Sequence, residues 1–199
     1  MPRIDPFSPL TAEARAASLA RTLASAPDDI WVFAYGSLIW KPAFHVAERR
    51  RAILHGARRS FCVWSVLARG TPDCPGLGLG LVSDSAAQCE GVALKLGAGD
   101  RNAALVSLWE REMWTDVYVP IWRDLETRHG RLRAIVFEVN TKSRQYSGAL
   151  PQDEIARVVR RARGKFGTCR DYFNETVAAL HRSGIRCETM RALEKAVER

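Results

Sequence analysis

The chain has 199 residues, 47% hydrophobic and 26% charged, which fits one globular domain with a complete core. No apolar run approaches the roughly 20 residues that a membrane-spanning helix needs, and residues 1–9 include Asp5 and lack the apolar stretch of a secretion signal, so we expect a cytoplasmic protein without a membrane partner. The net charge of +8 would suit nucleic acid. No helix-turn-helix, zinc-finger or aromatic RNA-binding signature accompanies the basic clusters, and we therefore expect a solvated basic surface and no specific nucleic-acid partner.

The cysteines and histidines lack the spacing of a disulfide framework or a metal site. No Cys-x-x-Cys occurs, the cysteine count is odd and the four histidines are scattered. Without an export signal, this predicts reduced thiols and no bound metal. The cysteine in the predicted strand over 52–68 is expected to pack in the core. The five cysteines are Cys62, Cys74, Cys89, Cys169 and Cys187.

The first half of the chain is predicted to contain one helix followed by strands. An alanine-rich stretch over 11–25 predicts a short surface helix, and the apolar run that begins at Trp31 predicts a buried strand. Two prolines and two glycines make 69–76 a shaped loop. Further strands are predicted over 52–68, 77–83 and 90–96.

The second half is predicted to be mainly helical. A helix over 100–114 precedes two strands, 117–123 and 131–139, that form a hairpin through 128–130. Strands first and helices last, with one helix between, predict an α+β domain. No linker divides the chain, so we treat 1–28 as an N-terminal helical extension and 29–199 as the domain. The C-terminal helices are predicted over 152–165, 168–183 and 189–197.

The end of the first strand is the first candidate site. Tyr35 comes directly before a Gly36-Ser37 turn. Glycine lets a ligand approach the main chain, and successive amides at such a turn can bind an anion. The alternative is a core strand that simply ends in glycine, as many do.

The predicted helix over 100–114 carries a carboxylate within its apolar stripe. At about 100° per residue, Glu112 falls about 20° from Leu105 and between Leu108 and Trp109. We expect Trp109, Met113 and Trp114 to surround it, and burial to raise its pKa. Such a carboxyl suits a general base, whereas the alternative is a structural ion pair with Arg69 or Arg111.

Six motifs together resemble one known family in their order and spacing. They are Tyr35-Gly36-Ser37-Leu38-Ile39-Trp40, Phe61-Cys62-x-Trp64-Ser65, Arg69-Gly70-Thr71-Pro72-Asp73-x-Pro75-Gly76, Leu108-Trp109-x-Arg111-Glu112-Met113, Tyr118-x-Pro120-x-Trp122 and Gly164-x-x-Gly167-x-x-x-Asp171-Tyr172. They resemble the bacterial, glutathione-specific branch of the ChaC-like γ-glutamylcyclotransferases over roughly residues 31–185. The stretch 84–88 departs from that pattern because it lacks glycines, which predicts an altered loop near the site.

The resemblance implies a γ-glutamylcyclotransferase-like small mixed β-barrel with flanking and C-terminal helices. It also implies cleavage of glutathione to 5-oxoproline and cysteinylglycine, by a monomer or weak dimer that needs neither metal nor organic cofactor. In the family, the Tyr-Gly-Ser-Leu loop binds the γ-glutamyl group and the glutamate after arginine is the base. These roles carry over to Glu112 and, as substrate-binding residues, to Tyr35, Gly36, Ser37, Leu38 and the adjoining Ile39.

Two further side chains are candidate substrate contacts. Arg69 is expected either to orient the glycyl carboxylate or to have a structural role in its loop. Tyr146 lies in a polar stretch, where an exposed aromatic side chain could cover the site as a lid.

The implied chemistry leaves three alternatives open. The turn amides could hold either the substrate's α-carboxylate or the developing oxyanion. The same turn and base would also serve other γ-glutamyl amino acids or amines. A non-catalytic basic binding module is the third alternative, and the intact turn and Glu112 argue against it.

Overall fold

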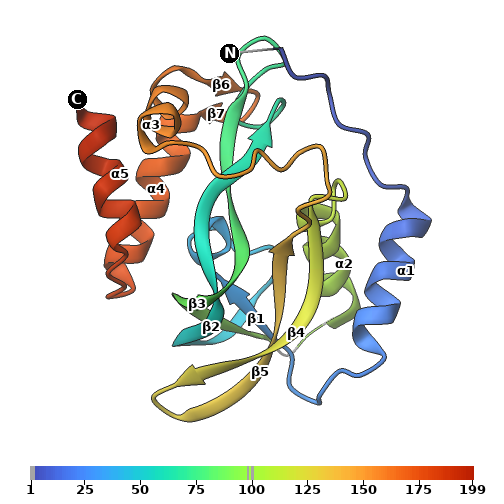
Figure 1. Ribbon diagram of the computed structural model, residues 1–199. Helices are drawn as coiled ribbons and strands as arrows, with labels where there is room; N and C mark the ends of the chain where they lie inside the picture. Colours follow the sequence, from blue (N-terminus) through green and yellow to red (C-terminus); the bar gives the residue numbers. More distant parts are fainter. Residues whose placement is uncertain (1–2, 98, 100) are drawn as a thin grey trace.

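A computed structural model describes residues 3–97, 99 and 101–199 (Figure 1). The helices are α1 (Ala12–Leu23), α2 (Arg101–Glu112), α3 (Gln152–Arg161), α4 (Cys169–Arg182) and α5 (Glu188–Glu198), with a 3₁₀ turn η1 at Ser37–Ile39. The strands are β1 (Trp31–Ala34), β2 (Val46–Ser65), β3 (Gly76–Leu96), β4 (Tyr118–Thr127), β5 (Gly130–Val139), β6 (Arg163–Gly164) and β7 (Gly167–Thr168).

Five strands close into a barrel in the order β1-β3-β2-β4-β5. Neighbouring strands are antiparallel except at the seam, where β1 pairs in parallel with β5 through Val32 and Ile135. The large buried side chains of these strands include Phe33, Leu94 and Phe137. The prediction of an α+β fold built on a small mixed barrel is confirmed.

β2 and β3 form one long hairpin, where the sequence predicted separate strands over 77–83 and 90–96. Pairing runs from Ser65–Gly76 towards Val46–Leu96, and is interrupted where His55 pairs with Gln88 and Ala57 with Ser83. Residues 84–87 thus lie opposite Gly56 alone, whose φ of +77° marks a bend. Extra residues on one strand bend a ladder without ending it, so the glycine-free stretch 84–88 lies within β3.

The helix predicted over 152–165 ends early, at Arg161. The chain then forms the small β6–β7 hairpin, because Gly164 lies directly against another segment: a Cβ atom there would come within 2.5 Å of the Gly70 nitrogen and the Ala68 carbonyl carbon. α4 begins immediately afterwards with a capping box between Thr168 and Asp171.

The helices lie on two sides of the barrel (Figure 1). α3, α4 and α5 form one group, and α1 and α2 form the other. α1 is tied down by the indole N–H of Trp109, which donates to Ser18 Oγ at 3.2 Å, and by that of Trp122, which donates to the Thr22 carbonyl at 2.7 Å. No helix within the described residues is long and apolar enough to cross a membrane.

Candidate active site

A small pocket opens where β1 ends. It brings together the turn after β1, the C-terminal residue of α2 and side chains from β3, β4, β5 and α4. Residues from six separate elements therefore converge on one place. The lining residues are Tyr35, Gly36, Ser37, Leu38, Leu79, Glu112, Tyr118, Phe137 and Tyr172.

The turn is held by its own backbone. The amide of Ile39 donates to the Gly36 carbonyl at 3.0 Å, and the amide of Lys41 donates to the Ser37 carbonyl at 2.8 Å. Gly36 has a φ of −142°, so a left-handed conformation does not require glycine here. A Cβ atom at Gly36 would sit 3.5 Å from the Tyr172 hydroxyl and from Leu79, and would fill space on the pocket wall.

Glu112 ends α2 with its carboxyl in the pocket, and only 15% of its side chain is exposed. Burial raises the pKa of Glu112, and the charge of Arg111 offsets this only in part. Of the two partners that the sequence suggested, Arg111 is the one in contact, with Nε 3.1 Å from Glu112 Oε1. A carboxyl with a raised pKa can exchange protons near neutral pH.

Arg111 also connects Glu112 to the turn. Its Nη2 donates to Ser37 Oγ at 2.8 Å, and its Nη1 donates to the Lys41 carbonyl. One guanidinium thus fixes the position of the carboxylate relative to the turn. The ion pair with Arg111 and the role of general base, which the sequence offered as alternatives for Glu112, are therefore compatible with one arrangement.

The surroundings of Glu112 differ from the sequence expectation. Trp114 is 50% exposed and Trp109 and Met113 are not among the pocket-lining residues. Tyrosines from three elements line the pocket in their place. Tyr118 and Tyr172 belong to quoted motifs but were not predicted as site residues, because nothing in the sequence shows that β4 and α4 meet the end of β1.

The three tyrosines keep neutral hydroxyls around the carboxyl. Burial raises the pKa of Tyr35 and Tyr118 well above the usual value and that of Tyr172 to about 12, and the nearby Glu112 charge adds to each shift. The Tyr35 hydroxyl donates to the Phe137 carbonyl at 2.8 Å and the Tyr118 hydroxyl to the Leu79 carbonyl at 2.7 Å. These bonds fix the pocket wall without adding charge.

The remaining predicted site residues lie outside the lining. Ile39 is buried in the core. Arg69 lies behind Tyr172, with its guanidinium 5.6 Å from the ring centre and its Nη1 donating to the Thr168 carbonyl at 3.3 Å. Tyr146 is half-buried, pairs with Val63 and packs on a small cluster that contains Cys62, so it is not the exposed side chain that the sequence suggested.

The chain matches the family model described as ChaC-like protein over residues 30–199. It belongs to the ChaC-like family. This ChaC-like protein is 35% identical over 192 residues to the glutathione-specific γ-glutamylcyclotransferase of Escherichia coli strain K12, a match that covers 95% of the chain and 82% of that relative. It is 32% identical to γ-glutamylcyclotransferase 2-3 of Arabidopsis thaliana, over 79% of the chain and 82% of the plant protein.

Solved structures agree with this ChaC-like fold. The crystal structure of the yeast γ-glutamyl cyclotransferase specific to glutathione, in its selenomethionine form, superposes with a TM-score of 0.78. The match covers 86% of the chain and 96% of the yeast protein at 22% sequence identity. The mixed barrel is therefore the fold of known γ-glutamylcyclotransferases.

Proposed function

We propose that this protein cleaves glutathione to 5-oxoproline and cysteinylglycine. The observation that carries the proposal is the buried Glu112 carboxyl, which faces the turn at Tyr35–Leu38 across one pocket. Relatives named as glutathione-specific enzymes from bacteria to mammals support the choice of substrate.

The reaction requires no protein nucleophile. The α-amine of the γ-glutamyl group attacks its own γ-carbonyl carbon, a five-membered ring closes and the bond to the cysteinyl nitrogen breaks. Intramolecular attack is fast once the chain is bent correctly, with effective molarities of ~10⁵ M or more. The first task of the pocket is therefore to hold the bent γ-glutamyl chain.

Glu112 performs the proton transfers in this proposal. Its carboxylate takes a proton from the α-ammonium group, which frees the amine to attack, and returns a proton to the departing cysteinyl nitrogen. Burial supports this role because it raises the pKa of Glu112 towards the working pH. Arg111 holds the carboxylate in place and moderates the shift.

The turn and its neighbours would bind the two ends of the substrate. The amides at Gly36–Leu38, which line the pocket, would hold either the α-carboxylate or the oxyanion. Tyr35 would contact the γ-glutamyl group through its ring, because its hydroxyl already donates a hydrogen bond to the Phe137 carbonyl. Arg69, behind Tyr172, would attract the glycyl carboxylate. The role of Tyr146 as a lid stays a prediction.

The test measures 5-oxoproline and the released amine after incubation with glutathione and, separately, γ-glutamyl-alanine. We expect glutathione to be converted and Glu112→Gln to lower turnover by at least ~10²-fold with substrate binding kept, the lower end for acid–base catalysis. Glu110→Gln is the matched control, because Glu110 is exposed on the same helix. If γ-glutamyl-alanine alone is converted, the substrate assignment is wrong. Normal turnover in Glu112→Gln would show that Glu112 is not the base.

A further inference from the structure

The turn that lines the pocket is held from behind by a buried arginine. Arg59 in β2 is 6% exposed, and its Nε and Nη2 donate to the carbonyls of Tyr35 and Glu90, at 2.5 and 2.6 Å. The Tyr35 carbonyl belongs to the peptide group that joins Tyr35 to Gly36. The guanidinium therefore fixes the orientation of the first peptide group of the turn.

This buried charge has no carboxylate counter-ion among the described residues. None of the ion pairs between those residues includes Arg59. The carboxylate of Glu90, whose carbonyl Arg59 contacts, pairs with Arg51 instead, at 2.5 Å. A buried charge that is not neutralised is costly, so a negative charge bound nearby would lower the cost.

The other side of the same peptide group is open to a ligand. Gly36 lines the pocket, and no hydrogen bond among the described residues uses its amide N–H. A trans peptide group holds its C=O and its N–H on opposite sides, so this N–H is directed away from Arg59. Because linked hydrogen bonds polarise one another, a cation on the Tyr35 carbonyl makes the Gly36 N–H a stronger donor.

The other arginines that contact the turn lack this combination of burial and unbalanced charge. Arg111 donates to Ser37 Oγ, but its charge is balanced by Glu112 at 3.1 Å. Arg49 donates to the Ile39 carbonyl at 2.9 Å but is exposed, so water and salt screen its charge.

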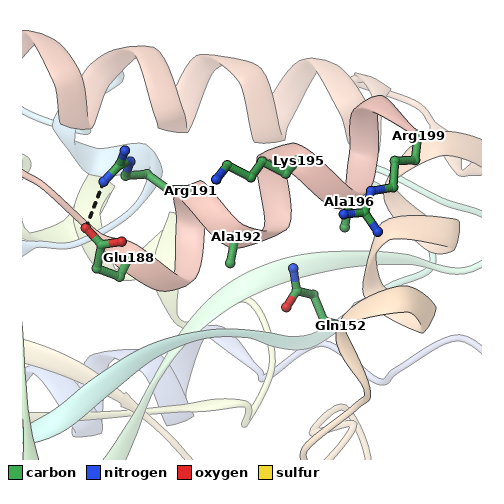
Figure 2. Close-up of a pocket in the computed structure, with 7 residues that line it drawn as sticks. All are labelled: Gln152, Glu188, Arg191, Ala192, Lys195, Ala196 and Arg199. Atoms are coloured by element: carbon green, nitrogen blue, oxygen red, sulfur yellow. Dashed lines mark hydrogen bonds and ion pairs between the residues drawn. The ribbon is translucent and has the colours of Figure 1, made fainter.

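The basic residues of α5 form a different kind of surface. Figure 2 shows Arg191, Lys195 and Arg199 along one hollow, with Arg191 paired with Glu188. All three basic side chains are exposed, and exposed charges are weakened by solvent. Among the charged residues that the structure describes, Arg59 is the least exposed.

We propose that Arg59 is a positioning residue for the substrate's α-carboxylate, which its buried charge attracts through the Gly36 amide. This inference rests on the proposed function, because it assumes that the γ-glutamyl group binds at the turn. It also chooses between the α-carboxylate and the oxyanion as the group held there. Arg59 is charged before any ligand arrives, and only the α-carboxylate is charged on binding, whereas the oxyanion forms during the reaction.

The experiment compares two ligands that differ in one charge. 5-Oxoproline keeps the α-carboxylate of the γ-glutamyl group, and 5-oxoprolinamide replaces it with an uncharged amide. Calorimetric titration measures the Kd of each ligand. We expect Arg59→Gln, which removes the charge but keeps a polar side chain, to weaken 5-oxoproline binding by about 5-fold or more, the lower end for coupling between two groups. The same substitution should leave binding of the amide nearly unchanged.

Two variants test whether charge is the cause. Arg59→Lys keeps the charge and should retain most of the preference for 5-oxoproline. Arg58→Gln is the matched control, because Arg58 precedes Arg59 on the same strand, is 41% exposed and pairs with Asp84 at 3.4 Å. It should leave both Kd values unchanged.

A purely structural role of Arg59 predicts a different result. It would weaken both ligands equally in Arg59→Gln, and equal losses would overturn the proposal, as would an equally large loss in Arg59→Lys. The wild type provides a test that needs no variant to fold: failure to bind 5-oxoproline more tightly than the amide would also overturn the proposal. Glutathione turnover is assayed separately. Its absence in the wild type would reject the proposed function, whereas the comparison of the two ligands tests Arg59.

Discussion

Arg111 has two functions that a single residue seldom combines. It is the counter-charge of a catalytic candidate, Glu112, and it also donates to Ser37 in the turn that we propose binds the substrate. Removing its charge would leave the Glu112 carboxylate buried with nothing to balance it, which is costly. The acidity of Glu112 is thus set by the competition between burial and one neighbour.

We predict that Arg111→Met shifts the acid side of the pH–rate profile to higher pH. Loss of the guanidinium removes the interaction that lowers the pKa of Glu112, so the carboxyl stays protonated, and inactive as a base, over a wider range. Rates of glutathione conversion across the acid side of the pH–rate profile provide the check. Arg101→Met, on the same helix but bound to backbone carbonyls near Asp28, should leave the profile in place.

The raised pKa of Glu112 also predicts whether the protein gains or loses stability as the pH rises. A carboxyl whose pKa is raised by folding opposes folding once the pH exceeds its pKa in the unfolded chain. Relative to Glu112→Gln, the wild-type free energy of unfolding should therefore fall as the pH rises from about 4.3 to the folded-state pKa, and then level off. Urea titrations across this range measure both free energies of unfolding, and a wild-type value that rises with pH relative to that of Glu112→Gln would contradict the raised pKa.

The site was partly predictable because part of it is local. Glu112 stands out by helical periodicity and Tyr35–Leu38 by one strand-to-turn transition, both visible within short windows. Tyr118 and Tyr172 do not, since their hydroxyls contact the backbone of Leu79 and a backbone group has no sequence signature. Contacts between a side chain and the backbone across a barrel can be predicted only when the barrel is known.

At the scale of elements, the glycines of β3 serve different purposes. Gly80 faces a crowded wall: a Cβ atom there would lie 2.2 Å from Val139 Cγ2 and 2.8 Å from Cys62 Sγ. Gly78, two residues earlier, would place its Cβ atom 3.7 Å from the Val63 carbonyl, an ordinary contact. The alternation of leucine and glycine therefore thins one face of the strand only where β5 and β2 come close.

These two positions form a matched pair of substitutions. Gly80→Ala should destabilise the protein by about 1–3 kcal/mol, because an extra methyl group in a full core forces its neighbours to move. Gly78→Ala should be close to neutral. Thermal and urea unfolding of both variants provide the comparison, and equal losses would mean that space at Val139 does not decide the outcome.

The elements that the sequence mispredicted share one cause. The sequence predicted a loop at 84–88 between two strands, yet the bend at Gly56 keeps these residues within β3. The helix predicted to reach residue 165 has suitable composition, but Gly164 must lie against Ala68 and Gly70. In both places the conformation of the backbone is set by a segment far away in the sequence, which a local sequence pattern does not reveal.

At the scale of the whole molecule, α1 stabilises the helix that carries Glu112. Ser18 and Thr22 receive hydrogen bonds from Trp109 of α2 and Trp122 of β4, and Leu19 and Leu23 pack against the core. The family model begins only at residue 30, so α1 lies before the matched region. We propose that residues 1–28 form a helical extension that supports the active-site helix of the 29–199 domain.

Removal of residues 1–28 should therefore weaken both stability and turnover. The loss of the leucine contacts alone is expected to cost about 2 kcal/mol or more, and exposed Trp109 and Trp122 should shift the fluorescence emission to longer wavelength. Thermal unfolding, emission spectra and glutathione conversion check this. A truncated protein with wild-type stability and turnover would show that α1 is a passive attachment.

The parallel pairing of Val32 with Ile135 joins strands that lie far apart along the chain. The pocket depends on this seam, since Tyr35 follows one strand and Phe137 belongs to the other, and it also needs Tyr172 from α4. Contacts between distant segments form slowly, so the pocket is completed late in folding. Because Tyr172 lies in α4, nascent or proteolysed chains that end before α4 lack a complete pocket. A truncated product in the cell would therefore not consume substrate.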